Sequence, residues 1–552
     1  MKTRLDSGWL VSVARPILAL ALLAPGAGAD IIGGGPVAGI WTVAGSPYLV
    51  TGEIDVPVGE TLVIEPGVEV RFEGWYKFNV HGCLLAVGAE ADSIRIHAAD
   101  PGTGWHGLRL LATATSGQPA SRLAYCRIED GRALGSCPDN SGAGLYLDHA
   151  KADLRHCLIT GNQAITGAGS WGGGGLALDY CAEVTIAHCR IEGNATGGDG
   201  GGIYLYWSTP TIEGNVISGN NAVRGDGISA LMYSAADLRG NTIAGNGGQG
   251  VYLSGSAASL VNNRIEDNQG SGVECYLCDP HLIGNLIAGN DAYHGGGVLL
   301  TGSDARLTNN TIAGNSASQG GGIYATWHSV GIIIPSEPIL TNTVVYGNTA
   351  GAGAQLLVNT NCAASLRYCD VQDLASGGIQ GSAILVEGNL DLPPAWTGDG
   401  DHPYALAADS PCRDAGTPDC SGLLLPATDL AGHERICGGC VDIGAYEYSA
   451  GVPVIEGPPV PASTLAPAYP NPFNPRTTLT FRLPAAGAAR LDIVDVAGRR
   501  LATVWDGPAP AGVSTVSWTG TDTHGRPLPS GTYLARLRAA GTVAVRPLQL
   551  VR

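Results

Sequence analysis

The sequence is poor in two residue types that often fill the cores of helical proteins. Its 552 residues include only 4 phenylalanines and 2 methionines, whereas glycine reaches 83. This composition excludes a helix-rich enzyme and favours short strands separated by many turns. Hydrophobic residues still make up 44% of the chain, so it is not disordered throughout. The chain is too long for one compact core, and we expect two or more structural units.

The sequence also lacks an apolar run long enough to span a bilayer, so we expect no membrane span. Residues 1–29 are instead typical of a signal peptide. Arg15 precedes the apolar run 17–24, and residues 27–29 form an A-x-A cleavage site. We therefore predict an exported protein, secreted or held at a bacterial cell surface. Its 14 cysteines then meet an oxidising compartment, in which disulfides can form.

Positive charge is scarce in the main part of the chain. The formal net charge is −18; because residues 1–29 contribute +2 and residues 467–552 contribute +6, residues 30–466 carry −26. Such an acidic body repels nucleic acid and anionic membranes, and it repels anionic polysaccharides unless a cation bridges them. We therefore expect no nucleic-acid partner. The basic tail either contacts an anionic partner or only aids solubility.

One phrase, Asn-x-Ile-x-x-Asn, recurs through the middle of the chain. It occupies residues 215–220, 241–246, 263–268, 285–290 and 310–315, and its closing asparagines are 22 to 26 residues apart. Earlier copies have cysteine in the opening place, at Cys126, Cys157 and Cys189. Glycines and a short apolar strand with period-two alternation follow each copy, so one face of each strand points inward.

A repeat of this size cannot bury its apolar face alone. Stacking coil on coil pairs each strand with its equivalents above and below, about 4.8 Å away. Glycine and asparagine supply corner residues with positive φ, and stacked asparagines can form a hydrogen-bonded ladder. We therefore predict a solenoid of roughly nine or ten coils over residues 125–372.

These phrases resemble the repeats of pectate-lyase-like right-handed parallel β-helix proteins. Residues 59–68 resemble the opening coils of such proteins, and residues 409–416 and 441–447 resemble a closing segment that often follows them. The resemblance implies the fold. It does not carry the enzymology, because neither the clustered aspartates of pectate lyases nor the polygalacturonase motifs are recognisable.

Residues 449–468 are rich in Pro, Gly and Ala and are typical of a linker. Beyond them, strands are predicted at 478–483, 490–496 and 531–537, with a turn at 496–499, and about seven short strands fit an Ig-like sandwich. This part resembles the FlgD-type Ig-like domain and related C-terminal sorting domains, which implies contact with secretion machinery and no catalysis. The whole is an all-β chain with these predicted divisions: 1–29 signal peptide, 30–124 N-terminal cap and first coils, 125–390 β-helix repeats, 391–448 closing segment, 449–468 linker, 469–552 Ig-like domain.

Three aromatic residues, Tyr180, Trp207 and Tyr233, fall in one register on successive coils. Rings about 4.8 Å apart would offer a platform to a sugar ligand. The alternative is a stack that packs a side loop or covers the flank of the helix. These residues are the candidate ligand-binding set.

Asp148 and Asp179 share a register on neighbouring coils. Two carboxylates at such a short distance can share a proton, bind Ca²⁺ or act as a glycosidase pair. The alternative to such a site is a pair of solvated acids on the surface. We expect no lysine or arginine in the adjoining strands, which argues against catalysis. Apart from this possible Ca²⁺, no cofactor is expected.

The histidine and cysteine pattern predicts no metal site. His156 and His188 share a register, but neighbours on one sheet form a row and not a tetrahedral cage. Cys126, Cys157 and Cys189 are expected to replace asparagine in the ladder, although a disulfide between two of them is an alternative. Cys275 and Cys278 form a lone C-x-x-C. We expect local disulfides at Cys362–Cys369, Cys412–Cys420 and Cys437–Cys440.

Three functional hypotheses remain at this point. The first is a non-enzymatic surface protein whose flank binds glycans or other envelope components. The second is a polysaccharide lyase or glycoside hydrolase with an unfamiliar site on the same flank, which predicts a groove that holds Asp148, Asp179 and a basic residue. The third is a structural spacer without a ligand.

Overall fold

The computed structural model describes residues 29–111, 120–165, 172–398, 400–436, 439–449, 464–465, 468, 471, 473–483, 487–494, 499–510, 512–523, 525–539 and 542–551. The predicted signal peptide, apart from Ala29, lies outside these residues, as does most of the predicted turn at 496–499. The chain divides into two compact units, residues 1–450 and 451–552. Within the described part the only helix is a 3-10 turn, η1 (Val43–Gly45), and no helix there is long and apolar enough to cross a membrane.

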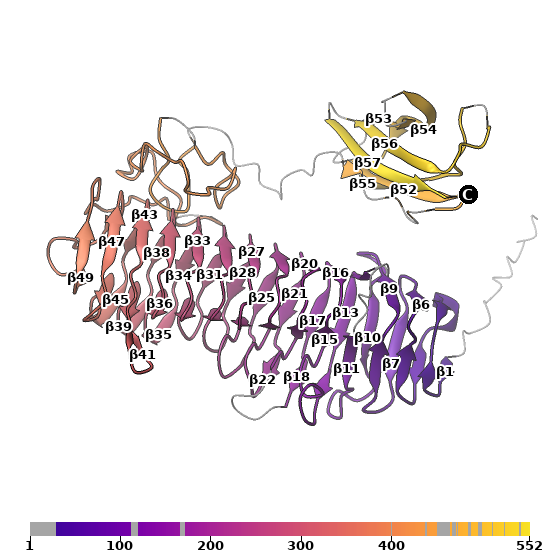
Figure 1. Ribbon diagram of the computed structural model, residues 1–552, viewed down its shortest axis with the longest axis horizontal. Coiled ribbons are helices and arrows are strands. Elements are labelled where there is room, and N and C mark those ends of the chain that lie inside the picture. Colours follow the sequence, from indigo (N-terminus) through magenta and orange to yellow (C-terminus); the bar gives the residue numbers. More distant parts are fainter. Residues whose placement is uncertain are drawn as a thin grey trace, which may run out of the picture. The chain divides into compact units, whose positions relative to one another are not determined.

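The first unit is a solenoid in which each coil contributes one strand to each of three parallel sheets of fourteen strands (Figure 1). We name the three sheets A, B and C. Sheet A consists of β1 (Asp30–Ile32), β4 (Tyr48–Val50), β7 (Glu69–Phe72), β10 (Ile94–Ala98), β13 (Cys126–Glu129), β17 (Leu158–Thr160), β21 (Arg190–Glu192), β25 (Val216–Ser218), β28 (Thr242–Ala244), β31 (Arg264–Glu266), β34 (Leu286–Ala288), β38 (Thr311–Ala313), β44 (Val344–Tyr346) and β48 (Asp370–Val371).

The other two sheets run alongside sheet A with the same strand order. Sheet B consists of β2 (Gly35–Pro36), β5 (Ile54–Val56), β8 (Lys77–Val80), β11 (Gly107–Leu111), β15 (Leu145–Asp148), β19 (Leu176–Asp179), β23 (Ile203–Tyr206), β26 (Ile228–Leu231), β29 (Val251–Ser254), β32 (Val273–Tyr276), β36 (Val298–Thr301), β40 (Ile323–Thr326), β46 (Leu356–Val358) and β49 (Ile379–Gln380). Sheet C consists of β3 (Gly39–Trp41), β6 (Thr61–Ile64), β9 (Cys83–Val87), β12 (Ser121–Ala124), β16 (Ala152–Arg155), β20 (Val184–Ala187), β24 (Thr211–Glu213), β27 (Asp237–Arg239), β30 (Ser259–Val261), β33 (His281–Ile283), β37 (Arg306–Thr308), β43 (Ile339–Thr341), β47 (Ala364–Arg367) and β50 (Ala383–Leu385).

Smaller strands lie outside the three sheets. Two three-stranded parallel sheets extend the coils locally, and one antiparallel hairpin follows β40. Their members are β14 (Arg132–Ala133), β18 (Gln163–Ala164) and β22 (Ala195–Thr196); β35 (Asp291–His294), β39 (Ser316–Gln319) and β45 (Thr349–Ala352); and β41 (His328–Ser329) with β42 (Ile333–Ile334).

The predicted repeat phrase places its isoleucine in the interior of the coil. Ile217, Ile243 and Ile265 pair in register along sheet A and are fully buried. Burial of an aliphatic side chain of this size contributes about 1.5–3 kcal/mol relative to an exposed one. Because every coil repeats this contribution, the stack is held together mainly by its interior rows.

Hydrogen-bonded ladders run along all three corners of the coil. After sheet A, Asn246 donates from Nδ2 to Oδ1 of Asn268 at 2.9 Å, and Asn220 donates in the same way to Asn246 at 3.1 Å. After sheet C, asparagines continue the row that Cys126, Cys157 and Cys189 begin, and Cys189 donates its backbone N–H to Asn215 Oδ1 at 2.8 Å. The predicted asparagine and cysteine ladder is therefore confirmed.

The third ladder, after sheet B, was not predicted. Serine takes the place of asparagine there, and Ser208 accepts the backbone N–H of Cys181 at 3.0 Å. The residue directly before a ladder position often has positive φ, as His149 (53°) and Asn309 (53°) do after sheets B and C. This left-handed residue turns the chain and points its side chain away from the interior.

The predicted disulfides within the described residues are not formed. All described cysteines are free, and Cys437 lies outside the described residues. Cys362 belongs to the ladder after sheet B, where its Sγ accepts from Ser336, whereas Cys369 belongs to the ladder after sheet C. Because the two lie at different corners, closeness in sequence does not bring their sulfurs together. Cys412 instead donates to Asp370 Oδ2 at 3.3 Å, and Cys420 donates to Thr417 O at 3.6 Å.

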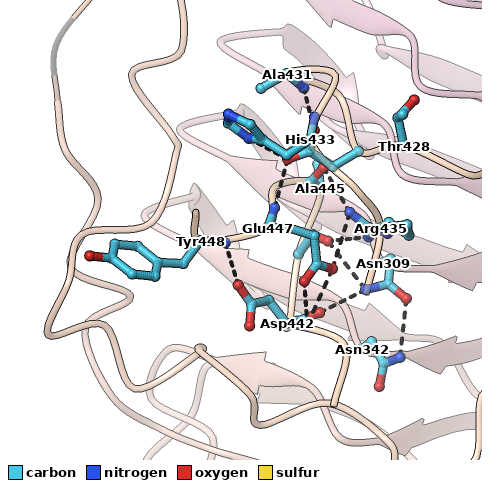
Figure 2. Close-up of polar contacts among 12 residues, drawn as sticks. Asn309, Asn342, Thr428, Ala431, His433, Arg435, Asp442, Ala445, Glu447 and Tyr448 are labelled. Carbon is cyan, nitrogen blue, oxygen red and sulfur yellow. Dashed lines mark hydrogen bonds and ion pairs between the residues drawn. The ribbon is translucent and has the colours of Figure 1, made fainter. Parts of the chain in front are cut away.

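The closing segment (residues 391–448) folds back along the corner after sheet C (Figure 2). Asn309 donates from Nδ2 to Asp442 O at 2.7 Å, and Asn342 Oδ1 accepts the N–H of Thr417 at 2.8 Å. Inside the segment, Arg435 lies 3.6 Å from Glu447, and both side chains are almost fully buried. The segment is thus docked by polar contacts over several coils.

The second unit is a sandwich of two antiparallel sheets, as predicted for an Ig-like domain. Leu491, Leu537 and Trp518 lie in its core. One sheet contains β51 (Thr464–Leu465), β52 (Thr477–Leu483) and β55 (Gly512–Trp518); the other contains β54 (Arg500–Ala509), β53 (Gly487–Val494), β56 (Gly531–Ala539) and β57 (Thr542–Leu550). Strand β51 lies within the stretch that the sequence predicts as a linker. Its two residues pair with β52, so this part of the stretch belongs to the sandwich.

Candidate functional site

The candidate ring residues form a row at the corner after sheet B. Tyr180 and Trp207 stack with ring centroids 6.3 Å apart and an interplanar angle of 18°. Trp207 and Tyr233 follow at 4.6 Å, tilted by 44°. The row begins one coil earlier than predicted, because His149 stacks on Tyr180 at 4.9 Å. We call these four residues the ring row.

Tyr233 is in the row but not in strict register. Strand pairing sets Tyr206 opposite Leu231, so the true partner of Trp207 is Met232, and Tyr233 is one extra residue at this corner. Met232 and Tyr233 both have positive φ, at 48° and 57°. The extra left-handed residue returns the chain to the ladder at Ser234 and leaves the Tyr233 ring beside Trp207.

The ring row presents edges and one open face. His149, Tyr180 and Trp207 cover part of one another's faces by stacking, so mainly their edges remain for a ligand. Tyr233 is different, because the next coil has Gly255 at this corner and offers no ring to cover it. Tyr233 is accordingly the most exposed of the three predicted aromatics, at 69% against 45% for Tyr180 and 44% for Trp207.

The two candidate carboxylates join the ring row at its first member. Asp148 and Asp179 are paired in register on β15 and β19, as predicted. Asp148 Oδ1 contacts His149 Nδ1 at 2.6 Å, and 37% of the Asp148 side chain is exposed. His149 therefore belongs to both sets of residues, and sequence reasoning missed it.

Asp179 lies beneath this surface. Only 2% of the residue is exposed, and burial raises the pKa of its carboxyl to about 7, with the neighbouring Asp148 adding to the shift. Its Oδ2 accepts a hydrogen bond from the Tyr146 hydroxyl at 2.8 Å, whereas its Oδ1 has no hydrogen-bond partner among the described residues. Asp179 is thus a buried acid with one unused acceptor.

The expectation that no basic residue lies in the adjoining strands is wrong. Arg109 on β11 pairs in register with Tyr146 on β15, and its guanidinium lies 4.3 Å from the centre of the Tyr146 ring. Arg109 is 3% exposed and lies 3.7 Å from Asp139. The absence of a basic residue is therefore no longer an argument against catalysis. Arg109 is nevertheless behind the surface and not at it.

The outer face of sheet B continues as a polar row that the repeat phrase did not reveal. Arg224 donates to both carboxylate oxygens of Asp199, at 3.0 and 2.7 Å, and its guanidinium lies 5.2 Å from the ring of Tyr252. The period-two alternation of β23 and β29 marks Tyr204 and Tyr252 as outward-facing, and this is the signal that would have found them.

A separate stack of rings lies at the corner after sheet C. Tyr125 stacks on His156 at 4.8 Å, and His156 stacks on His188 at 5.3 Å. The predicted register of the two histidines is therefore confirmed. Farther along this corner the closing segment covers the turns. A pocket beside it is lined by His281, Arg306 and Leu424 among others, and no residue of the ring row lines it.

The class of protein follows from these features. Three parallel sheets with three ladders define a right-handed parallel β-helix, and a separate sandwich follows it. Residues 127–349 match the protein family described as "Periplasmic copper-binding protein (NosD)", and residues 472–542 match the FlgD Ig-like domain. The chain therefore contains one segment similar to the NosD family and another similar to the FlgD Ig-like domain. No curated protein matches the chain.

Solved structures with similar coordinates are distant in sequence. A pectate lyase, Pel9A, is 13% identical with a TM-score of 0.36, and the match covers 71% of this chain and 89% of that one. The periplasmic alginate epimerase AlgG is 14% identical with a TM-score of 0.29, covering 63% and 85%. An alginate lyase from Paenibacillus sp. str. FPU-7 is 14% identical with a TM-score of 0.25, covering 60% and 94%.

The residues that the structure describes do not fit the copper that the matched family's description names. Two metal–imidazole bonds of about 2.0–2.1 Å place their nitrogens at most about 4.2 Å apart. His156 and His188 stack with centroids 5.3 Å apart, so their equivalent nitrogens are too distant to share one ion. Across the described residues, no group of three or more His, Cys, Asp or Glu side chains is placed to hold a metal.

Proposed function

We propose that this chain is an extracytoplasmic β-helix protein that binds glycan chains at the ring row. The observation that carries the proposal is the continuous exposed line of Asp148, His149, Tyr180, Trp207 and Tyr233 on four successive coils. Its rings repeat from coil to coil, which suits a polymer whose units also repeat. Aromatic rings with polar handles are well suited to sugars, which have both apolar faces and hydroxyls.

The location is supported by the signal-peptide pattern of residues 1–29 and by the periplasmic description of the family that matches residues 127–349. Whether the mature protein stays in the periplasm or reaches the cell surface depends on the C-terminal unit. This unit engages the secretion machinery in our proposal, as the resemblance of its sequence to C-terminal sorting domains implies. This role requires no catalysis.

A second candidate function is turnover of the bound glycan by proton transfer. It is favoured by the contact of 2.6 Å between Asp148 and His149, which orients an exposed imidazole, and by Asp179, whose carboxyl titrates near neutrality. Against it stands the burial of Asp179 and Arg109, which keeps both groups from touching a ligand. Binding without turnover is therefore the better supported function.

The test of binding uses the full chain and two variants of the ring row. Trp207→Gly and Tyr233→Gly remove rings but keep the backbone, because glycine readily adopts the positive φ of these positions. Tyr293→Ala is the matched control, since Tyr293 is 73% exposed on β35, outside the ring row. Retention on a panel of neutral, cationic and anionic polysaccharides is expected to fall for both ring variants and not for the control.

Retention of Trp207→Gly and Tyr233→Gly equal to that of the unaltered chain would overturn the proposal. The second candidate is tested on whichever glycan is retained, by following the release of new reducing ends or unsaturated products over time. Product release that disappears in His149→Gly would replace binding by catalysis as the function of this surface.

A further inference from the structure

The surroundings of the ring row are acidic. Asp148 is half-exposed at its first member, and Asp179 lies in register behind it. The cations nearby are already engaged or buried: Lys151 pairs with Glu183 at 2.5 Å, and Arg109 lies beneath Tyr146. A ligand that reaches the row therefore meets the exposed carboxylate of Asp148, which contacts His149 through Oδ1 and interacts with the buried Arg109.

The long-range field has the same sign as this local charge. Residues 30–466 carry a net charge of −26 by sequence, so the β-helix attracts cationic polymers and repels anionic ones before contact. Such steering acts mainly on the rate of association and weakens as salt is added. An anionic glycan would need a bridging cation, and among the described residues no group of three or more His, Cys, Asp or Glu side chains is placed to hold one.

One further observation points to a cationic group in the ligand. Tyr233 has an open face, because Gly255 follows it on the next coil. An ammonium group over a tyrosine face gains about 0.5–1 kcal/mol at an exposed site.

From these observations we infer that the glycan bound at the ring row is an amino-sugar polymer with free ammonium groups. This inference rests on the proposed function and goes beyond it, because it sets the charge class of the ligand. One ammonium group pairs with Asp148 at the first member of the row, and another packs over the open face of Tyr233 at the last. Polyuronates, which carry a carboxylate on each unit, are rejected by the same charges.

The test compares three soluble oligosaccharides of equal length by calorimetry with the full chain at low and high salt. They are fully deacetylated chito-oligosaccharide, its N-acetylated counterpart, and oligogalacturonate. The deacetylated form is expected to bind at least about tenfold more tightly than the neutral form, corresponding to about 1.4 kcal/mol. Its affinity should fall with added salt, and oligogalacturonate should not bind.

Two matched acid variants separate the local charge from the general one. Asp148→Asn keeps the shape of the side chain but removes its charge, and it is expected to lower the affinity for the deacetylated form about tenfold. Glu90→Gln removes one exposed charge on the turn between β9 and β10, outside the ring row, and is expected to leave the affinity within about twofold.

Each outcome bears on one of the two proposals. Equal affinity for the neutral and deacetylated forms, or equal loss in Asp148→Asn and Glu90→Gln, would overturn the inference and leave glycan binding in place. Tighter binding of oligogalacturonate would overturn it as well. Failure of all glycans to bind, here and on the polysaccharide panel, would remove the proposed function itself.

Discussion

The corner after sheet C and the corner after sheet B are built on the same plan, but their outer sides differ. Both have a left-handed residue followed by a ladder residue. After sheet C, asparagines at the left-handed position bind the closing segment and are fully buried, as Asn309 and Asn342 are (Figure 2). After sheet B, the same position carries His149, Tyr180 and Trp207, which remain exposed.

This difference separates a surface that stabilises the fold from one that is free to bind. At the covered corner, Asn309 and Asn342 bond to the closing segment, which also contains the buried pair of Arg435 and Glu447. The open corner contributes partly exposed rings that stack on one another, with Tyr206 packed edge-on against Tyr180. We therefore expect substitutions at the covered corner to lower stability, and substitutions at the open corner to lower binding.

The largest effect is expected from Arg435→Met. This change leaves Glu447, Asp442 and Asp429 buried without their cation, and breaking a buried pair on one side typically costs about 3–5 kcal/mol. The measurement is chemical unfolding together with proteolysis of residues 391–448. Arg367→Met is the control, because Arg367 and Glu387 form an exposed pair that contributes about 0–1 kcal/mol. Equal effects of the two changes would contradict the comparison.

A smaller effect is expected from raising the pH. Burial raises the pKa of Glu447 from about 4.5 to about 8, although Arg435 opposes the shift. The folded chain then holds a proton that the unfolded chain releases above about pH 4.5, so this contribution is present below that pH and is lost as the pH rises toward 8. Protease resistance of the closing segment should fall over this window.

The matched variant for the pH effect is Glu447→Gln, whose side chain does not titrate. Its protease resistance should depend less on pH than that of the unaltered chain. Part of the slope should remain, because burial also raises the pKa of Asp442. An unchanged slope in Glu447→Gln would assign the effect to other groups.

Asn309→Gly should have a moderate effect, because it removes a contact of 2.7 Å to Asp442 O while keeping the backbone at positive φ. Loss of a buried hydrogen bond costs about 1–3 kcal/mol when one partner is left unsatisfied. His188→Gly is the control at the same corner with the same φ of 53° but without the closing segment above it. Its free energy of unfolding should change by less than about 0.5 kcal/mol.

The smallest effect on stability is expected from Tyr233→Gly. The ring is 69% exposed and its backbone φ of 57° suits glycine, so the free energy of unfolding should change by less than about 0.5 kcal/mol. Thermal and chemical unfolding would measure this change. A loss of several kcal/mol would show that the ring row supports the fold and would move it to the same class as the covered corner.

The sequence predicts much of the solenoid because its repeat spacing is nearly constant. Where coils are 22 to 26 residues long, a residue and its neighbour on the next coil can be matched by counting. The asparagine ladder follows from such counting. Asp148 and Asp179 are 31 residues apart and are matched by their place after Leu145 and Leu176, and His156 and His188 are matched by the cysteines that follow them. The predicted register of Tyr233 is not observed, because its corner holds one extra residue.

Counting along the sequence misses neighbours on coils of unusual length. It also misses contacts that depend on which corner of the coil a residue occupies. Arg109 precedes its partner Tyr146 by 37 residues, so the repeat spacing does not connect them. His149 is not part of a pattern of tyrosine and tryptophan residues, although its imidazole ring stacks on Tyr180 in the same way. Cys362 and Cys369 are seven residues apart but belong to different corners. Sequence separation alone therefore predicts neither the contact of Arg109 with Tyr146 nor the separation of Cys362 from Cys369.

The left-handed corner residue has a consequence for how such a protein changes over time. At this position glycine, asparagine, histidine, tyrosine and tryptophan all occur in one chain with nearly the same φ. A side chain there leaves the interior packing of its coil untouched. Surface chemistry can therefore be rewritten one coil at a time, without repacking the core and without altering the length of the coil. The open corner is therefore a row of positions on which a new ligand specificity can be assembled one coil at a time.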